Sequence, residues 1–260
     1  MVTVSELAAD PPPANLYKYR SFDKDRVGAA PYEWDRSIIL DGRLWAGSPL
    51  GFNDPFDCFA VIDFEGSSEE KEAWAAGVAP DQGVSVEQVI KLVEVALTNP
   101  EAQAQLLGWR QTLETVGVLS LTERPDDMLM WAHYAKSHKG YCLEFDATIP
   151  PLSLAYRVAY AEQRPTFRLF DPDRADIIAR TLLHKADFWK HEREWRMVRP
   201  FEIGPIQFPP SALKTIILGA GIAQDDEAAL RAAVAERGTH VAFKRMQLNE
   251  QNYQLDIIDA

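Results

Sequence analysis

The sequence predicts an α+β fold with a mixed, mostly antiparallel core of short strands. Short alternating or apolar runs bounded by turn residues recur along the chain, as in Leu16–Arg20 and Ala212–Leu218. Apolar stripes at helical spacing are fewer, and they do not alternate regularly with the strands as in β-α-β repeats. The 260 residues, 47% of them hydrophobic, suffice for one domain with a sizeable core.

The charge and the start of the chain restrict the class of protein. A formal net charge of −12 argues against sequence-blind binding to nucleic acid or anionic membranes, although a local basic patch remains open. The N-terminus lacks a basic segment followed by an apolar run, and no stretch approaches about eighteen apolar residues. We therefore expect a cytoplasmic protein that does not contact a membrane. Cys58 and Cys142 lack CxxC spacing and are expected to be buried free thiols.

The elements before residue 65 are predicted from alternation and turn residues. Residues 1–15 end in three prolines and are expected to form a flexible or extended arm. Asn53-Asp54-Pro55 is a strong turn signal, which Phe52 and Phe56 would hold against the core. Strands are predicted at Leu16–Arg20, Arg43–Gly47 and Cys58–Phe64, a strand or helix end at Ser37–Leu40, and a helix start at Ser21–Asp25.

A helical insertion is predicted over about residues 65–116 of a single domain that spans residues 16–260. Residues 65–85 are expected to be a loop because Gly77, Pro80 and Gly83 would interrupt a helix. Val86–Ala96 carries apolar residues at helical spacing, and a second helix is expected over 101–114.

Strands and helices mix in the second half of the chain. Helices are predicted at Asp127–Ser137, at about 173–189 and at Asp225–Arg237. Strands are predicted at Gly117–Leu121, Gly140–Asp146, Leu154–Ala161, Ala212–Leu218, Val241–Lys244 and Tyr253–Ile257.

The segment Phe188–Arg196, FWKHEREWR, concentrates charge more than any other. As a strand it would place Glu192, Glu194 and Arg196 on one face and Trp195 on the other. As a helix it would only pair Glu192 with Arg196, four residues apart, on a solvated surface. We favour the strand because the preceding helix is expected to end near Trp189 and a proline follows at position 200. Its polar face is then the expected wall of a functional site.

Several familiar kinds of site are not supported. The chain has no GxGxxG after a strand, no phosphate-binding GK[ST] loop and no GxSxG. His133 and His138 are five residues apart, which is not the spacing of a helical zinc pair, so no metal site is predicted. Both histidines fit a structural role, although nearby lysines keep a phosphate contact open. Trp131 and Tyr134 equally fit a core role, and Asn53 fits a turn former.

Five blocks of sequence resemble a bacterial family known as domain of unknown function 2971. They are LYKYR, LWAGSPLGFNDPFDC, LMWAHYAKSHKGYCLEF, WKHEREWRMV and LKTIILGAG, and the resemblance extends from about Leu16 to Ile258. That family name implies no activity. The order of the blocks is also similar, more distantly, to the ADP-ribosyltransferase superfamily. The chain departs from that pattern because it has neither a Ser-Thr-Ser block nor a His-Gly-Thr entry.

The ADP-ribosyltransferase resemblance implies that NAD is a co-substrate and that ADP-ribose passes to a macromolecule, either protein or nucleic acid, as in a toxin or defence effector. Breaking the nicotinamide bond builds positive charge on the ribose, which a carboxylate stabilises. The resemblance assigns that carboxylate to Glu194 or Glu192, with His133 as a further catalytic candidate. It implies that either Arg20 or Lys18 is the first-strand cation for NAD, and that either Ser48 or the block from Trp131 to Tyr134 lies near the nicotinamide. Further candidates for NAD binding are Tyr19, Asn53, His138 and Arg196.

Two alternatives from other classes remain open. One is a non-catalytic module that binds a nucleotide or nucleic acid in the same pocket. The other is a nuclease-like hydrolase that holds a divalent metal with Asp54, Asp57, Glu192 and Glu194. The proposed site requires Arg20, His133 and Glu194 to line one cleft, and it is wrong if they point to different surfaces.

Overall fold

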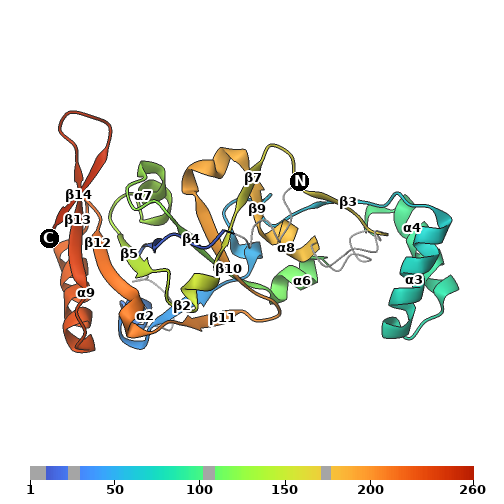
Figure 1. Cartoon of the computed structure of the whole chain (residues 1–260), viewed down its shortest axis with the longest axis horizontal. Coiled ribbons are helices and arrows are strands. Elements are labelled where there is room, and N and C mark those ends of the chain that lie inside the picture. Colours follow the sequence, from blue (N-terminus) through green and yellow to red (C-terminus); the bar gives the residue numbers. More distant parts are fainter. Residues whose placement is uncertain (1–9, 23–29, 102–108, 171–176) are drawn as a thin grey trace.

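The computed structural model describes residues 10–22, 30–101, 109–170 and 177–260. Its fold is α+β, as predicted, and the largest sheet of the described residues has eight strands (Figure 1). Their order across the sheet is β14 (Leu255–Asp259), β13 (Ala242–Leu248), β12 (Leu213–Leu218), β5 (Tyr141–Asp146), β1 (Asn15–Arg20), β4 (Gly117–Thr122), β10 (Glu194–Arg199) and β6 (Tyr156–Arg157). All neighbouring pairs are antiparallel except β12 and β13, so the sheet is mixed and mostly antiparallel.

The sheet consists of two halves that separate between β1 and β4. Strand β1 pairs with β5 from Asn15 to Arg20, and β4 pairs with β10 over its whole length. Between β1 and β4 themselves, a single register pair joins Tyr17 to Thr122. Beyond that pair the facing edges of the two strands lack a continuous ladder, and side chains can enter the gap.

Alternation along the strands divides the core between the two faces of the sheet. Leu16 of β1 belongs to the largest hydrophobic cluster, which also includes residues of α2 (Glu33–Asp41) and α9 (Gln224–Arg237). Tyr19 belongs to a second cluster on the opposite face, together with Met130 and Trp131 of α7 (Met128–Tyr134). Successive side chains of a strand point to opposite faces, which explains this division.

Smaller elements surround the sheet. Two-stranded sheets are formed by β2 (Arg43–Ala46) with β11 (Gly204–Gln207), β3 (Val61–Asp63) with β8 (Thr166–Arg168), and β7 (Ala159–Ala161) with β9 (His184–Ala186). Two short α-helices are α6 (Trp109–Thr115) and α8 (Ile177–Leu182), and four 3-10 helices are η1 (Pro49–Gly51), η2 (Leu152–Leu154), η3 (Asp187–Glu192) and η4 (Pro210–Ala212).

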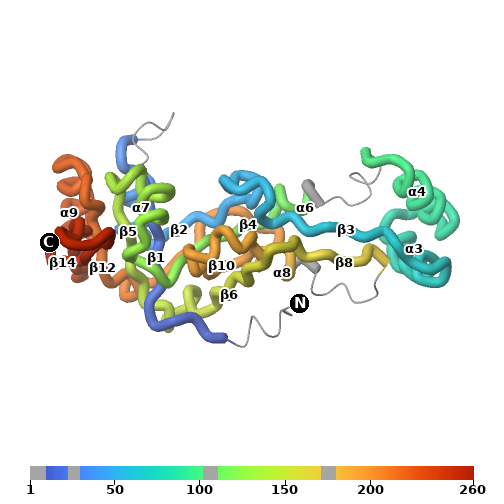
Figure 2. Tube along the Cα trace, turned by 90° about the horizontal axis from the view of Figure 1, so that it is seen from above, coloured from blue at the N-terminus to red at the C-terminus, as the bar shows by residue number. Residues whose placement is uncertain are grey.

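Helices α3 (Ser68–Gln82) and α4 (Val86–Thr98) form an arm that projects from the body of the protein. They pack on each other through their own cluster, which includes Trp74 and Val89, at the far end of the β3–β8 ribbon (Figures 1 and 2). The prediction of a loop over 65–85 is therefore wrong. A capping box begins α3, since Ser67 Oγ accepts from the Glu70 amide while the Glu70 carboxylate accepts from the Ser67 amide. Gly77 and Pro80 would weaken an isolated helix by more than this box stabilises its start, so α3 also depends on the packing of its buried face, which includes Trp74, against α4.

The helix predicted over about 173–189 is also wrong in its C-terminal half. Residues 171–176 lie outside the described residues, and α8 ends at Leu182. The chain then forms β9, which pairs in parallel with β7, and the 3-10 helix η3. Pairing with a distant strand has overridden the local helical pattern. The expected strand Leu154–Ala161 likewise divides into β6 and β7, which pair with β10 and β9.

Other predictions agree more closely with the structure. Strands β1, β2, β4, β5 and β12 and helices α4, α7 and α9 lie within a few residues of their expected positions. Ser37–Leu40 belongs to a helix, and Cys58–Phe64 yields a strand only over Val61–Asp63, since Cys58 has a left-handed backbone (φ 60°). The expected helix starting at Ser21 falls mostly on undescribed residues.

Both thiols are free and buried, as predicted, and Cys142 lies in β5. No helix among the described residues is both long and apolar enough to cross a membrane.

Candidate functional site

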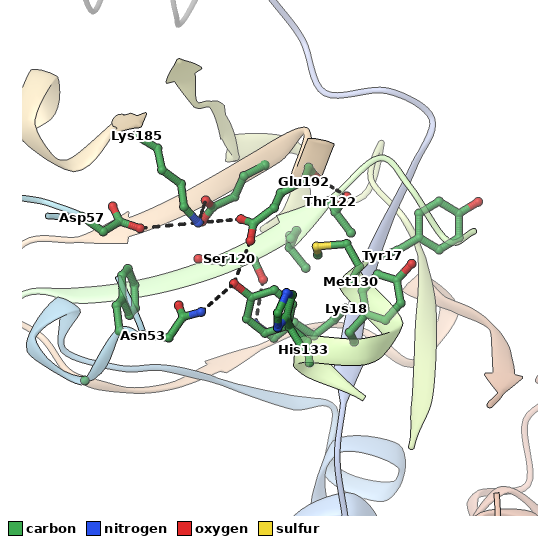
Figure 3. Close-up of a pocket in the computed structure, with 16 residues that line it drawn as sticks. Tyr17, Lys18, Asn53, Asp57, Ser120, Thr122, Met130, His133, Lys185 and Glu192 are labelled. Carbon is green, nitrogen blue, oxygen red and sulfur yellow. Dashed lines mark hydrogen bonds and ion pairs between the residues drawn. The ribbon is translucent and has the colours of Figure 1, made fainter. Parts of the chain in front are cut away.

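A cavity of about 370 Å³ opens where β1 and β4 separate (Figure 3). Residues on both sides of the Tyr17–Thr122 pair line it, together with helix α7 and the turn that follows η1. The lining residues are Tyr17, Lys18 and Tyr19; Ser120, Leu121 and Thr122; Met130, His133 and Tyr134; Gly51, Phe52, Asn53 and Asp57; and Lys185, Glu192 and Glu194.

Local backbone geometry turns both glutamates of the charged segment toward this cavity. Arg193, between them, has a left-handed backbone (φ 42°) that ends η3 and begins β10. Glu194 then pairs in register with Thr122 of β4, while the Thr122 hydroxyl donates to the Glu192 carbonyl at 2.5 Å. The predicted strand thus begins at Glu194, and Glu192 belongs to the preceding 3-10 helix. Glu192 and Glu194 are each 3% exposed.

Arg196, two residues after Glu194 on β10, is completely buried behind the cavity. Its Nη2 lies 2.9 and 2.8 Å from the two carboxylate oxygens of Asp57. Its Nε and Nη2 donate to the oxygens of Glu194 at 2.8 and 3.0 Å, and its Nη1 donates to the Leu182 carbonyl at 2.6 Å. Arg196 therefore holds two carboxylates and does not line the cavity itself.

Lys185 joins the same carboxylates from the cavity side. Its ammonium lies 2.5 Å from Glu192, 3.1 Å from Glu194 and 3.5 Å from Asp57 (Figure 3). These three acids and the two cations, Lys185 and Arg196, form a buried charge cluster with one excess negative charge. Buried charges are tolerated when each is paired and hydrogen-bonded, as here.

The charge cluster lowers the pKa of Glu194 and raises the pKa of Lys185. Burial alone would raise the pKa of Glu194, but Arg196 and Lys185 outweigh it and hold that pKa well below its ordinary value. Burial alone would lower the pKa of Lys185, but Glu194, Glu192 and Asp57 together raise it. Glu194 is therefore an anion, and Lys185 is a cation, at neutral pH.

Glu192 differs from Glu194 in the partners of its two oxygens. The Tyr134 hydroxyl donates to Glu192 Oε1 at 2.7 Å, and Lys185 holds Oε2. Burial, and then the charge of Glu192, raises the pKa of Tyr134, so the phenol stays protonated and donates. The Asn53 amide donates in turn to the Tyr134 hydroxyl at 3.4 Å. Of the two glutamates, Glu192 is held by one cation and one neutral donor, and Glu194 by two cations.

Lys18 bridges the gap between the separated strands. Its ammonium donates to the Ser120 carbonyl of β4 at 2.8 Å, in place of a backbone ladder bond. Burial, followed by the charge of Arg20, lowers the pKa of Lys18 to about 8. A lysine with this pKa changes between its charged and neutral forms near physiological pH.

Seven of the residues predicted to take part in catalysis or NAD binding meet at this cavity. They are Lys18, Tyr19, Asn53, His133, Tyr134, Glu192 and Glu194. Tyr19 is almost buried and donates its hydroxyl to the Arg124 carbonyl at 2.7 Å, so it forms part of the wall as a core aromatic.

Five of the predicted binding residues do not line the cavity, namely Arg196, which lies behind it, and the four described next. Arg20 lines a second cavity and does not share the cleft with His133 and Glu194, so the predicted site that joins these three residues is wrong, and of the two first-strand cations Lys18 is the one that reaches this cavity. Ser48 caps a turn, donating to the Leu113 carbonyl and accepting from the Leu50 amide. Trp131 is fully buried against Tyr19, with ring centroids 5.1 Å apart. His138 lies in a left-handed turn after α7, and its carbonyl accepts from Gly221.

The sequence interpretation missed Lys185, Ser120 and Thr122. Lys185 fell within a predicted helix, where its charge looked like part of a solvated surface. Ser120 and Thr122 alternate with the apolar Leu119 and Leu121, and this period of two could have marked a polar face on β4.

Three of the four carboxylates proposed for a metal site lie together, but they surround a lysine instead of a metal position, and Asp54 lies apart. Asp54 does not line the cavity, and its Oδ1 accepts from the Phe56 amide as in an ordinary turn. Asp57, Glu192 and Glu194 surround Lys185 instead. Over the described part of the chain, no group of three or more His, Cys, Asp or Glu side chains is arranged to hold a metal ion.

Residues 130–197 match a family model described as protein of unknown function (DUF2971). The matched segment runs from α7 to β10 and carries Tyr134, Lys185, Glu192, Glu194 and Arg196. No curated protein and no solved structure matches the chain. The segment similar to this family therefore includes residues of one wall of the cavity, and the family description indicates no activity.

Proposed function

We propose that the cavity binds the nicotinamide-ribose end of NAD and that the protein transfers ADP-ribose to a macromolecular acceptor. The observation that carries this proposal is the position of Glu192 in a cavity at the split of the sheet, fixed by Tyr134 and Lys185. A carboxylate fixed before the substrate arrives stabilises positive charge without the cost of reorganisation.

The chemistry requires a negative site near the ribose. The bond between the ribose C1′ and the nicotinamide nitrogen breaks, and the nitrogen keeps the electron pair. The acceptor nucleophile forms the new bond to C1′ and loses its proton. Lys185 opposes the developing positive charge, but Asp57, Glu192 and Glu194 outnumber Lys185 and Arg196. With Lys18 on the opposite wall the charges balance, so stabilisation of the cationic transition state depends on the fixed position of Glu192 and not on an excess of negative charge.

We assign different roles to the two glutamates. Glu192 is the carboxylate that faces the ribose, because a ligand hydroxyl can compete with the neutral Tyr134 more readily than with a cation. Glu194 positions Lys185 and is itself fixed by Arg196. Lys18, on the opposite wall, is the cation for a phosphate group.

The size of the cavity supports binding of part of a dinucleotide. Its volume of about 370 Å³ lies toward the small end of the range for ligand sites, which is roughly 300–1,000 Å³. The aromatic rings of Phe52, His133 and Tyr134 on its wall provide surfaces for a pyridine ring.

The test combines binding and transfer. NAD binding is measured by calorimetry, and transfer by incubating the protein with labelled NAD and a cell lysate. Glu192→Gln should abolish transfer while the protein stays folded. Glu144→Gln is the matched control, because Glu144 also accepts from a tyrosine hydroxyl (Tyr17, 3.3 Å) but does not line the cavity. Absence of both NAD binding and transfer would refute the proposal.

A non-catalytic nucleotide-binding module is the second candidate. The 2.5 Å contact between Lys185 and Glu192 favours it, because the ion pair reduces the charge that Glu192 can offer a substrate. NAD binding without transfer, equal in the wild type and in Glu192→Gln, would favour this candidate. A metal-dependent hydrolase is less well supported, since Lys185 already occupies the position between the three acids.

A further inference from the structure

A second cavity, of about 410 Å³, lies on the face of the sheet that carries α2. Helix α2 and strand β2 form most of its wall, and Lys18 and Arg20 of β1 complete it. Lys18 therefore lines both cavities, whereas Glu192 and Glu194 line only the first.

Positive charge exceeds negative charge around this cavity, in contrast to the chain as a whole. The chain carries a formal charge of −12. The lining side chains include four cations and two acids, which are Lys18, Arg20, Arg36 and Arg43, with Glu33 and Asp41. Arg36 already donates to Glu236 at 2.7 Å, whereas Arg43 has a 3.8 Å contact with Asp41, so Arg43 is better placed than Arg36 to bind an anionic group through paired donors.

Two tryptophans provide an aromatic surface in the same cavity. Trp34 and Trp45 contact each other edge to face, with ring centroids 5.5 Å apart and an angle of 84°. Trp45 is 48% exposed, which is unusual for so large an apolar side chain. An indole held by a second indole and open to solvent is a surface on which a planar ring can stack.

The cation and the stacking surface lie on one side of one strand. Arg43 and Trp45 are both exposed in β2, while Leu44 between them is buried. Residues two apart on a strand are separated by roughly 7 Å along one face. Arg43 is bound only loosely, since its Nη1 lies 3.8 Å from Asp41. One ligand with a planar ring and a nearby anionic group can therefore contact both side chains.

We infer that this second cavity binds a nucleoside phosphate, with the base stacked on Trp45 and the phosphate held by Arg43. The ligand is either a free mononucleotide or the terminal nucleotide of a single strand, because both present the same chemistry. This inference does not depend on NAD chemistry in the first cavity.

Calorimetry with AMP, adenosine and a 5′-phosphorylated trinucleotide tests the inference. AMP or the trinucleotide should bind, and adenosine should bind at least about tenfold more weakly because it lacks the phosphate. Trp45→Ala and Arg43→Gln should each weaken binding by about tenfold or more. Arg157→Gln is the matched control, since Arg157 is 55% exposed and lies 3.7 Å from Asp10, much as Arg43 is 52% exposed beside Asp41.

A third variant separates the two cavities. Glu192→Gln should leave AMP binding unchanged if AMP occupies the second cavity. Preference for AMP over the trinucleotide identifies a free nucleotide, and the reverse preference identifies a nucleic-acid end. The inference is overturned if neither probe binds, if adenosine binds as tightly as AMP, or if binding is lost in Glu192→Gln but retained in Trp45→Ala.

Discussion

Arg196 holds Asp57, which lies 139 residues earlier in the chain, through contacts of 2.9 and 2.8 Å from its Nη2. The same guanidinium holds Glu194 on its own strand, so one buried cation joins the turn after η1 to β10. Arg196→Met should therefore lower the free energy of unfolding by about 3–5 kcal/mol, because two buried acids lose their main partner. Chemical denaturation of both proteins measures this difference.

Arg193→Met is the control for that experiment. Arg193 precedes the same strand, but its side chain is 55% exposed and its nearest carboxylate, on Glu123, is 4.0 Å away. Its loss should change the free energy of unfolding by less than about 1 kcal/mol. Equal effects of the two substitutions would show that the buried cluster does not stabilise the fold.

Glu194 should contribute to stability in a pH-dependent manner. Its pKa in the folded protein lies below the ordinary value of 4.5, so its contribution is present above pH 4.5 and is lost as pH falls further. Glu194→Gln should be less stable than the wild type at pH 7, and the difference should shrink as pH falls below 4.5. Urea midpoints between pH 7 and pH 3 provide the measurement. A difference that stays constant over this range would contradict the low pKa.

Lys18 should destabilise the fold at neutral pH. Its pKa is lowered to about 8 from 10.5, so the folded state disfavours its charged form. Lys18→Met should raise the free energy of unfolding at pH 7 by about 1 kcal/mol. Between pH 8 and 10.5 the unfolded state binds more protons at this site, so wild-type stability should rise relative to the variant. Thermal unfolding from pH 7 to 10 tests this, and a variant that is less stable at every pH would contradict it.

The affinity for NAD should also depend on Lys18 if the proposed function is correct. The ammonium loses its proton as pH rises through about 8, and with it the attraction for phosphate. NAD binding should weaken by several-fold between pH 7 and 9, and Lys18→Arg should remove this dependence because arginine stays charged. Calorimetric titrations at the two values compare the proteins.

Tyr134→Phe should lower both stability and ADP-ribose transfer, whereas its control should lower stability alone. The substitution leaves Glu192 Oε1 without its 2.7 Å donor and should cost about 1–2 kcal/mol of stability, together with a loss of ADP-ribose transfer. Tyr141→Phe is the matched control, because the Tyr141 hydroxyl donates at 2.6 Å to the buried Asp35, away from the cavity. It should lower stability by a similar amount while transfer is retained. Loss of transfer in both variants would indicate a purely structural effect.

The periodicity of the sequence was sufficient to predict the local elements with strong signals. The alternation in Leu16–Arg20 and Gly140–Asp146 and the helical stripe of Val86–Ala96 each lie close to the observed β1, β5 and α4. Each signal arises from burial of one face, which any core would require. The prediction of a loop over 65–85 is wrong because the capping box at Ser67 and the packing of α3 on α4 together outweigh the effect of Gly77 and Pro80.

Two residues of the charged segment Phe188–Arg196, Glu192 and Glu194, line the cavity, but the segment is divided between η3 and β10 and is not one strand. The alternation of Glu194, Trp195 and Arg196 is as predicted, with both charged residues on the polar face of β10. Glu192 joins them through a 3-10 helix and a left-handed Arg193. The sequence could not indicate this break, because a positive φ at arginine is selected by its surroundings and not by its own preference.

What the sequence determined by itself was the α+β class, the positions of most central strands, and the concentration of acidic and aromatic residues that line the cavity. Only the tertiary structure decided that Lys185 neutralises Glu192, that Arg196 lies behind the cavity, and that Lys18 lines both cavities whereas Arg20 lines the second one alone. The physical reason is that these relationships depend on where β1 and β4 separate. That point is set by pairing between segments about a hundred residues apart, and local periodicity carries no information about it.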